Sequence, residues 1–192
     1  MESGSRLKTQ LVHTKVINLW GGPGSGKSTT AADLFRLMKL RGHKVELVTE
    51  YAKELTYSEK WEKLAKQREV LEEQYERQNR LKGLDYIITD SPIPLSLIYA
   101  PVEYLSDPLF EKEVFDKYTQ FMNLNFVLHR VKPYSRYGRI QTSEQAKDID
   151  QQIKKFLRVY DIEYTTVRGD EDAAVMIYNV LIHNYDIKFL GV

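Results

Sequence analysis

Short apolar runs alternate with amphipathic segments along most of the chain. The runs have the length and composition of buried strands, and the segments between them place apolar residues at helical spacing. Strands are expected at 15–20, 44–49, 85–90, 125–130 and 162–167, and helices at 28–42, 58–82, 107–122, 142–158 and 171–185. Strands that alternate with helices form right-handed crossovers, so we expect a mostly parallel sheet covered on both faces. No composition shift marks a boundary, and residues 1–192 are predicted to form a single domain.

Several of the expected helices carry recognisable ends. Asp107 followed by Pro108 is typical of an N-cap and first helical position. Thr142, with Gln145 three residues later, predicts a capping box. Gly42 follows the first expected helix as a stop signal. In the long expected helix 58–82, one apolar stripe is predicted from Trp61, Leu64, Leu71 and Tyr75.

Bulk composition restricts the possible functions. The 192 residues are 42% hydrophobic and 29% charged, with a net charge of +1 and no cysteine. The composition is that of a folded domain. So small a net charge does not indicate a protein that binds nucleic acid over much of its surface. The lack of cysteine excludes disulfides and a thiolate nucleophile and fits a cytoplasmic location. No run of 18 apolar residues is present, so no membrane partner is expected. The sequence does not indicate an oligomeric state.

The clearest motif is "GGPGSGKS" at 21–28, which matches the phosphate-binding P-loop pattern in full. It stands between an expected strand and an expected helix, as the motif requires. Backbone N–H groups of such a loop surround a polyphosphate, Lys27 reaches the β- and γ-phosphates, and the Ser28 hydroxyl is placed for Mg²⁺. We therefore expect ATP and Mg²⁺ as cofactors. The nucleotide-binding residues are predicted to be Gly22, Pro23, Gly24, Ser25, Gly26, Lys27, Ser28 and Thr29.

Two carboxylates follow expected strands. Asp90 ends the run "DYIITD", and Glu50 follows the run "KVELVT". Because ligands of parallel sheets bind at the carboxyl ends of the strands, both are candidates for the site. Asp90 is predicted to serve Mg²⁺ with Ser28, and either carboxylate could take a proton from an acceptor hydroxyl. The alternatives are a turn aspartate at 90 and a glutamate at 50 that pairs with Lys53 or another cation.

A basic stretch, "RVKPYSRYGR", follows the fourth expected strand at 130–139. Guanidinium groups stabilise the charge on a phosphoryl group in transfer, most effectively when they arrive with the substrate. We predict an arginine lid at about 131–141, with Arg136 and Arg139 facing the transferring phosphoryl and Arg130 at its base. The alternative is a solvated basic loop.

Three glutamines share one face of the long expected helix. Gln67, Gln74 and Gln78 lie at helical spacing, and their amides could read the edge of a pyrimidine. The alternative is a solvated helix face. Nearby aromatic residues could stack a base or pack in the core; these are Tyr51, Tyr57 and Trp61.

The P-loop, the strand-end "DS", the basic stretch and the helix "TSEQAKDIDQQIKKFL" resemble the thymidylate-kinase-like P-loop kinases. More specifically, "INLWGGPGSGKSTTAADLFRLMKLRGHKVELVTEYAKEL", "DYIITDSP" and "YGRIQTSEQAKDID" resemble bacteriophage P-loop kinases that phosphorylate 5-hydroxymethyluracil in DNA. The resemblance covers about residues 15–170. It implies a P-loop NTPase three-layer sandwich of the nucleoside- or nucleotide-kinase type. The usual Asp-Arg pair is here Asp90-Ser91, which favours a hydroxyl acceptor over a nucleoside monophosphate.

The resemblance implies a kinase that transfers the γ-phosphoryl of ATP to the hydroxymethyl group of 5-hydroxymethyluracil in phage DNA. This step leads to hypermodified thymidine, which protects phage genomes from host nucleases, and it would place the protein in the host cytoplasm. Two alternatives remain. One is a kinase of free nucleosides or nucleoside monophosphates, and the other is a regulatory P-loop ATPase.

Overall fold

A computed structural model describes residues 14–131 and 142–185. In these ranges the five expected strands are all present, with small shifts at their ends. They are β1 (Lys15–Trp20), β2 (Val45–Val48), β3 (Tyr86–Thr89), β4 (Met122–His129) and β5 (Thr165–Arg168). The predicted single sheet is therefore confirmed. The predicted lid segment lies almost wholly outside the described residues.

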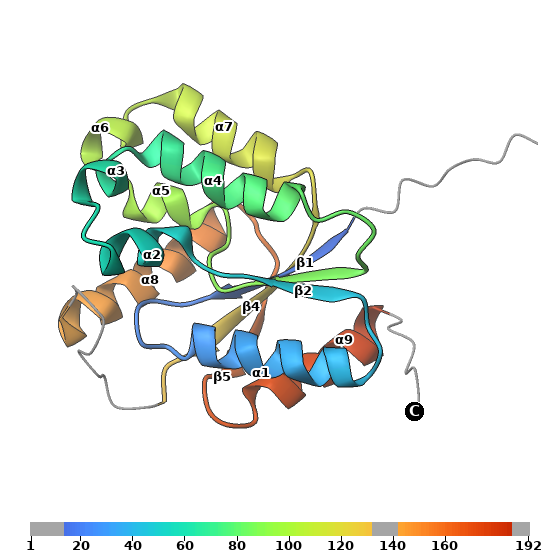
Figure 1. Ribbon diagram of the computed structural model, residues 1–192. Helices are drawn as coiled ribbons and strands as arrows, with labels where there is room; N and C mark the ends of the chain where they lie inside the picture. Colours follow the sequence, from blue (N-terminus) through green and yellow to red (C-terminus); the bar gives the residue numbers. More distant parts are fainter. Residues whose placement is uncertain (1–13, 132–141, 186–192) are drawn as a thin grey trace, which may run out of the picture.

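The strands form one sheet in the order β2-β3-β1-β4-β5, and every neighbouring pair is parallel. β1, which is buried along all but its first residue, lies at the centre between β3 and β4 (Figure 1). Consecutive strands are joined by helices, as a parallel sheet requires. All strands thus end at the same edge, which brings the segments after β1, β2 and β3 together.

Helices cover both faces of this sheet. Their bounds are α1 (Lys27–Leu40), α2 (Tyr51–Tyr57), α3 (Trp61–Ala65), α4 (Gln67–Asn79), α5 (Leu95–Tyr99), α6 (Val102–Leu105), α7 (Pro108–Tyr118), α8 (Ser143–Val159) and α9 (Ala173–Tyr185). The predicted caps are present: the Asp107 side chain accepts from the Leu109 N–H, and Thr142 and Gln145 form the capping box.

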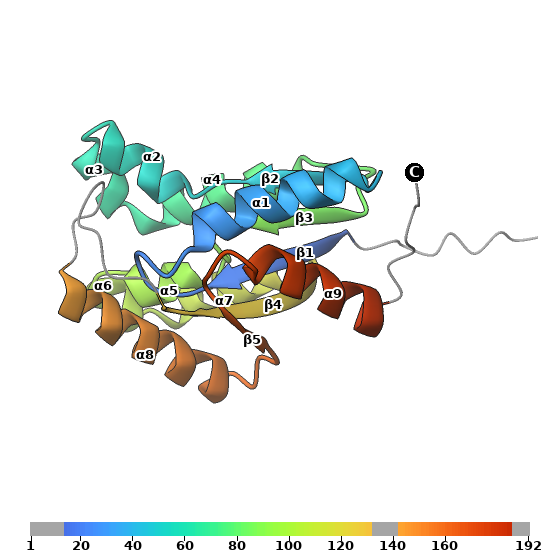
Figure 2. The ribbon, with the colours of Figure 1, turned by 90° about the horizontal axis from the view of Figure 1, so that it is seen from below.

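On one face of the sheet, α1 and α9 lie side by side (Figures 1 and 2). Leu34 and Met38 of α1 and Ile177 of α9 pack with Ile17 and Phe126 of the sheet into the largest hydrophobic core. This packing fixes the axis of α1 relative to β1. The loop between them is therefore held at both ends by buried structure.

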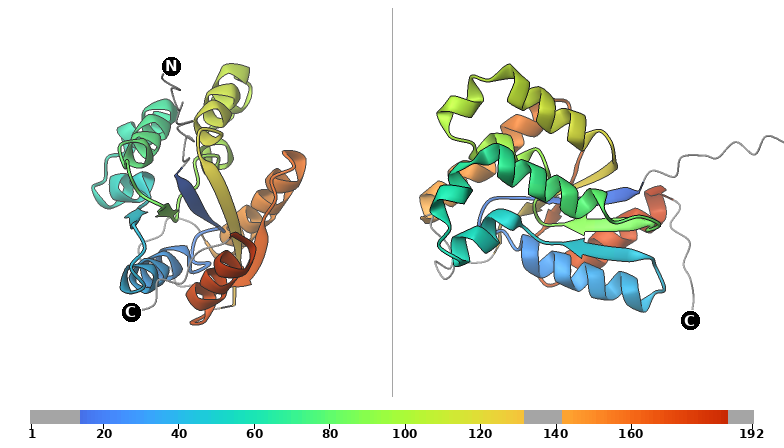
Figure 3. Two further views of the ribbon diagram at one scale, coloured as in Figure 1. Left: turned by 90° about the vertical axis from the view of Figure 1, so that its right-hand side faces the viewer. Right: turned by 45° about the horizontal axis from the view of Figure 1, so that its top comes forward.

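On the other face lie α4, α5, α7 and α8, as the end-on view in Figure 3 shows. One core joins α4, α5 and α7 around Leu71 and Phe110. A second core packs Trp20 and Val127 of the sheet against Ile153 of α8. The two helical layers and the sheet between them form the expected three-layer sandwich.

The predicted helix at 58–82 is wrong in detail. It consists of α3 and α4, which are separated at Lys66, where ψ is 77° and the helical path is broken. Trp61 is half exposed, so it does not continue the apolar stripe of Leu71 and Tyr75. The short helices α2, α5 and α6 were not predicted, since helices of four to seven residues show less than two turns of periodicity.

No helix in the described ranges combines the length and the apolar character needed to cross a membrane.

Candidate active site

The P-loop connects β1 to α1 and contains glycines in backbone conformations that other residues rarely adopt. Gly24 and Gly26 have φ values of 78° and 101°, in the region that side chains avoid. A Cβ on Gly21 would collide with the Ser25 hydroxyl. Gly26 is also the N-cap of α1, and no side chain caps the first turn. The first-turn N–H groups are therefore available for an anion, which fits a polyphosphate.

Lys27 is buried beneath this loop. Its ammonium donates to the carbonyl oxygens of Gly21 and Gly22, at 2.6 and 3.2 Å. Burial lowers the pKa of Lys27, while the negative charges of Glu50 and Asp90 oppose the shift. The ammonium thus stands under the phosphate nest with carbonyl partners that a phosphate can replace.

Ser28 and Asp90 meet across the edge of the sheet. The Ser28 hydroxyl donates to Oδ2 of Asp90 at 2.6 Å. Asp90 is almost completely buried at the end of β3, and its Oδ1 has no hydrogen-bond partner among the described residues. An orphaned carboxylate oxygen beside a hydroxyl is a fitting donor set for Mg²⁺, directly or through water. The structure thus brings together the two residues predicted to serve the metal.

Glu50 lies at the same edge of the sheet, after the neighbouring strand β2. It follows β2, is the N-cap residue of α2 and lines the main cavity. Burial raises the pKa of Glu50, and Asp90 adds to this, whereas Lys27 and Lys53 oppose it. Among the described residues no hydrogen bond reaches its carboxylate. Glu50 is therefore available to a ligand, whereas one oxygen of Asp90 is already engaged.

A cavity of about 510 Å³ extends from the P-loop into the helical layer above the sheet. Its floor includes Lys27 and Ser28, and its walls come from α2, α4 and α5. The polar wall residues include Glu50, Lys53, Gln67, Gln74, Ser91, Ser96 and Tyr99, and the apolar ones Leu64, Val70, Leu71, Ile93 and Leu95. This volume and mixed lining are typical of a site for one small organic ligand.

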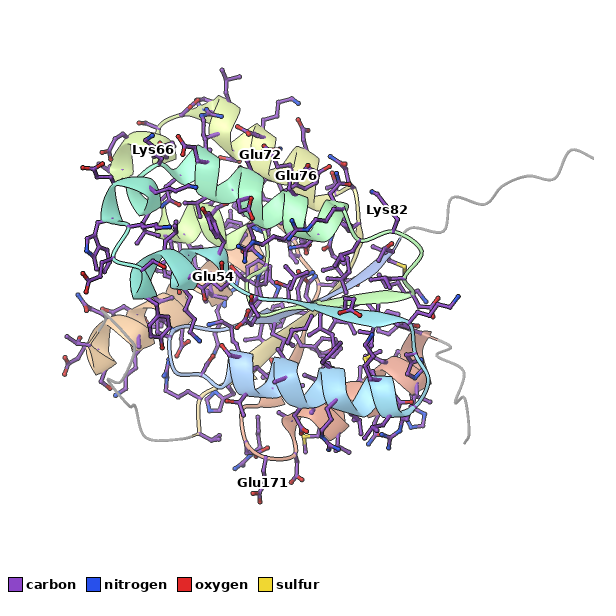
Figure 4. All side chains as sticks on the ribbon, in the orientation of Figure 1. Glu54, Lys66, Glu72, Glu76, Lys82 and Glu171 are labelled. Carbon is purple, nitrogen blue, oxygen red and sulfur yellow. The ribbon has the colours of Figure 1, made fainter. Side chains whose placement is uncertain are left out.

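The glutamines of α4 lie on the buried side of that helix, so a solvated face is excluded. Gln67 and Gln74 are 8% and 6% exposed and line the cavity. Gln78 is more deeply buried in the protein and is not among the residues that line the cavity. The charged residues Glu72 and Glu76 point outward from the same helix (Figure 4). Gln74 accepts from the N–H of Tyr51 at 2.9 Å, and Gln67 donates to the Leu64 carbonyl at 2.8 Å. Gln74 also donates to the Thr49 carbonyl at 3.5 Å. These bonds use only part of the hydrogen-bonding capacity of each amide.

The aromatic candidates have different surroundings. Tyr51 is buried, and the Arg77 guanidinium lies 4.6 Å from its ring centre, so it packs rather than stacks a ligand. Tyr57 is exposed and lines the cavity. Trp61 is half exposed and is not among the residues that line it. The unpredicted helix α5 adds Tyr99 to the cavity wall.

Of the predicted lid arginines, Arg136 and Arg139 lie outside the described residues and stay predictions. Arg130 is described and lies against the P-loop. Its Nη1 donates to the Pro23 carbonyl at 2.8 Å, and its Nε and Nη2 donate to Oδ2 of Asp150 at 3.1 and 3.0 Å. Arg130 is thus fixed at the edge of the phosphate loop, and its role at the base of a lid stays a prediction.

Three neighbours of the site were not predicted to be site residues, although Lys53 was considered as an ion-pair partner of Glu50. Asp150 of α8 contacts the P-loop directly. Lys53 of α2 reaches within 3.5 Å of the Ser28 hydroxyl. Gly169 follows β5 and is so close to Ser25 that a Cβ there would collide with the Ser25 carbonyl. This last loop also borders a second cavity, of about 480 Å³, against α1. None of the three belongs to a motif with fixed spacing.

Comparisons with known proteins agree with this geometry. Residues 16–173 match the model of the AAA_28 family, described as an AAA domain. A search of curated proteins finds no match for the chain.

Solved structures share the fold. A crystal structure of NadR protein in complex with NR superposes with a TM-score of 0.66 at 20% identity, over 92% of this chain and 53% of that chain. The present chain therefore spans about half the length of that protein. Deoxyadenosine kinase from M. mycoides with bound dATP gives a TM-score of 0.54 at 19% identity, over 88% of this chain and 100% of that one. The family match covers most of the chain, includes its P-loop and strand-end residues, and agrees with the fold, so the chain belongs to the AAA domain family AAA_28 and has a nucleoside-kinase-like P-loop fold.

Proposed function

We propose that the protein is a kinase that transfers the γ-phosphoryl of ATP to a hydroxyl group of a nucleoside-type acceptor. The observation that carries this proposal is the shared cavity. The P-loop residues Lys27 and Ser28 form its floor, and α2, α4 and α5 form walls of mixed polarity around the remaining space. A pure ATPase needs room for nucleotide and water, whereas this cavity of about 510 Å³ offers a pocket for a second organic molecule.

The residues divide the work as follows. The loop amides and Lys27 hold the phosphates of ATP. Ser28 and Asp90 would hold Mg²⁺, which neutralises phosphate charge and orients the donor. Glu50 takes the proton of the acceptor hydroxyl, because it lines the cavity with a carboxylate that no described group engages. Asp90 is assigned to the metal, because one of its oxygens already accepts a hydrogen bond from Ser28.

The wall opposite the P-loop fits a nucleobase. Two buried amides, from Gln67 and Gln74, stand beside the aliphatic side chains of Leu64 and Val70. Amides present paired donors and acceptors, which complement the edge of a pyrimidine, and aliphatic groups pack against its faces. The acceptor that the sequence resemblance favours is 5-hydroxymethyluracil in DNA, in which case the base enters the pocket flipped or from a single strand. The fold likeness to deoxyadenosine kinase favours a free nucleoside as the second candidate.

An acceptor panel with γ-labelled ATP tests the proposal. The acceptors are single-stranded and duplex DNA containing 5-hydroxymethyluracil, the same DNA with thymine, free 5-hydroxymethyl-deoxyuridine and deoxyadenosine. We expect label on hydroxymethyluracil DNA, with none on thymine DNA and none with Lys27→Ala. Label on free nucleosides alone would support the second candidate. Hydrolysis of ATP that no acceptor changes, with no labelled product, would overturn the kinase proposal.

A further inference from the structure

Asp150 connects α8 to the P-loop through both oxygens of its carboxylate. Its Oδ1 accepts from the Gly22 N–H at 2.6 Å, and its Oδ2 accepts from Nη2 and Nε of Arg130 at 3.0 and 3.1 Å. Arg130 in turn donates to the carbonyl of Pro23 at 2.8 Å. Two consecutive residues of the loop are therefore held by one ion pair, in which both side chains are largely buried, at 23% and 13% exposure.

The sequence of the loop accommodates this contact. A Cβ on Gly22 would lie 2.7 Å from Oδ1 of Asp150 and 2.7 Å from the carbonyl oxygen of Ala146, one turn earlier on α8. Only glycine lets the helix approach the loop so closely. The φ of Gly22 is not in the left-handed region, so close approach accounts for glycine at this position rather than backbone conformation.

Gly22 is also held by groups of the loop itself. Its carbonyl accepts from Lys27 Nζ and from the Ser25 N–H, each at 3.2 Å. Lys27 has to turn from these carbonyls to the phosphates when ATP binds, if it acts as the P-loop pattern predicts. The bond from Lys27 to the Gly22 carbonyl is then lost, whereas the bond from the Gly22 N–H to Asp150 does not involve Lys27 and is kept.

Only a carboxylate can make both contacts of Asp150. It accepts from the loop N–H with one oxygen and from the guanidinium with the other. An asparagine has a single acceptor oxygen and would turn its NH₂ group towards either Gly22 or Arg130. Asp150 also balances the charge of Arg130 in a site that already contains the buried ammonium of Lys27.

We propose that Asp150 is a positioning residue for the donor nucleotide, which holds the first residues of the P-loop and the Arg130 guanidinium in the geometry that receives the triphosphate. The proposal rests on the proposed function only in requiring that the loop binds ATP. It does not depend on the acceptor. Asp150 acts through Gly22 and Arg130 and has no assigned contact with the reacting atoms.

The test compares Asp150→Asn with Asp148→Asn, an exposed aspartate two residues earlier on α8. Affinities for Mg·ATP and for inorganic tripolyphosphate are measured by calorimetry, with the melting temperature of the nucleotide-free proteins. We expect Asp150→Asn to weaken both ligands by about ten- to a hundredfold, the effect of a lost charge-assisted bond. Asp148→Asn should match the wild type. Equal loss of affinity for Mg·ATP and for tripolyphosphate would show that the substitution acts on the P-loop.

Three results would overturn the proposal. One is unchanged or tighter ATP binding by Asp150→Asn, which would mean that the carboxylate restrains Arg130 instead of placing it. Another is a loss for ATP but not for tripolyphosphate. The third is a fall in melting temperature large enough for the unfolded fraction to explain the weaker binding. Because binding is measured without an acceptor, a failed acceptor panel leaves this test intact, and the two proposals fail separately.

Discussion

Two carboxylates of the same sheet edge differ because of their immediate neighbours. Asp90 gives one oxygen to Ser28, whereas Glu50 is left without a described hydrogen bond and is surrounded by the charges of Lys27, Lys53 and Asp90. The sequence placed both at strand ends but could not assign their roles, since these depend on contacts across the sheet. Our proposal of Glu50 as the base makes a prediction about pH.

Glu50→Gln should stabilise the free protein at neutral pH while lowering its activity. The pKa of Glu50 is raised in the folded state, so folding stability is highest below the ordinary pKa and falls as pH rises through the raised value. Glutamine is neutral at every pH. The Glu50→Gln variant should therefore be more stable than the wild type at pH 8, and the difference in stability should vanish towards pH 4. Melting curves across this range measure it. Turnover should fall about 10²- to 10⁴-fold, as for loss of a general base.

Glu54→Gln is the matched control for this prediction. Glu54 lies four residues later on α2 (Figure 4). It accepts a hydrogen bond from Arg77, which lowers the pKa of Glu54. A lowered pKa contributes stability above the unfolded value, which is lost as pH falls through the folded value. Glu54→Gln should thus slightly lower the melting temperature at pH 8 and leave turnover unchanged. Stabilisation by both variants would show that the raised pKa of Glu50 is not the cause.

Periodicity found the long elements and missed the short ones. The 14- and 13-residue helices α1 and α9 show several turns of apolar spacing, and their ends were predicted to within two residues. The five-residue helix α5 shows little more than one turn, and its formation depends on Leu95 and Leu97 packing into two different cores. The cavity wall that it forms could not be predicted for that reason. Tertiary contacts, rather than local propensity, decide such elements.

The loop after β5 is another element that the sequence left without a role. Gly169→Ala should weaken ATP binding, because the new methyl group collides with the Ser25 carbonyl and lies 3.2 Å from the carbonyl of His129. The P-loop or the β5–α9 connection has to move, and overpacking of this kind lowers stability by roughly 1–3 kcal/mol. Calorimetric titration with Mg·ATP should give at least a tenfold weaker affinity, equivalent to about 1.4 kcal/mol.

Gly83→Ala separates this clash from the general effect of replacing glycine. Gly83 has a φ of 72°, and a Cβ there meets nothing within 4 Å. The substitution should lower stability by about 1–2 kcal/mol through backbone strain alone. ATP affinity should not change. If Gly83→Ala and Gly169→Ala weakened ATP binding equally, the β5–α9 loop would have no specific part in holding the P-loop.

At the scale of the whole molecule, the parallel sheet collects residues from distant parts of the chain at one edge. The site draws on the segments after β1, β2 and β3, and on α8, which follows β4. The strand-end residues could be predicted because parallel strands share one carboxyl edge. Asp150 could not, since its place depends on how α8 crosses the sheet, which side-chain packing around Ile153 and Leu157 decides.

A site assembled from so many elements should couple nucleotide binding to the stability of the entire domain. A ligand that binds only the folded state at a hundred times its Kd adds about 2.7 kcal/mol to the free energy of unfolding. For a chain of this size, each kcal/mol raises the melting temperature by roughly 2–4 °C, so saturating Mg·ATP should raise it by roughly 5–11 °C. Differential scanning fluorimetry measures this shift directly.

Chelation of Mg²⁺ with EDTA should reduce the shift, because the oxygens of Ser28 and Asp90 would then lack the ion that links them to the phosphates. Lys27→Ala should nearly abolish it, and an unchanged shift in that variant would place the nucleotide away from the P-loop.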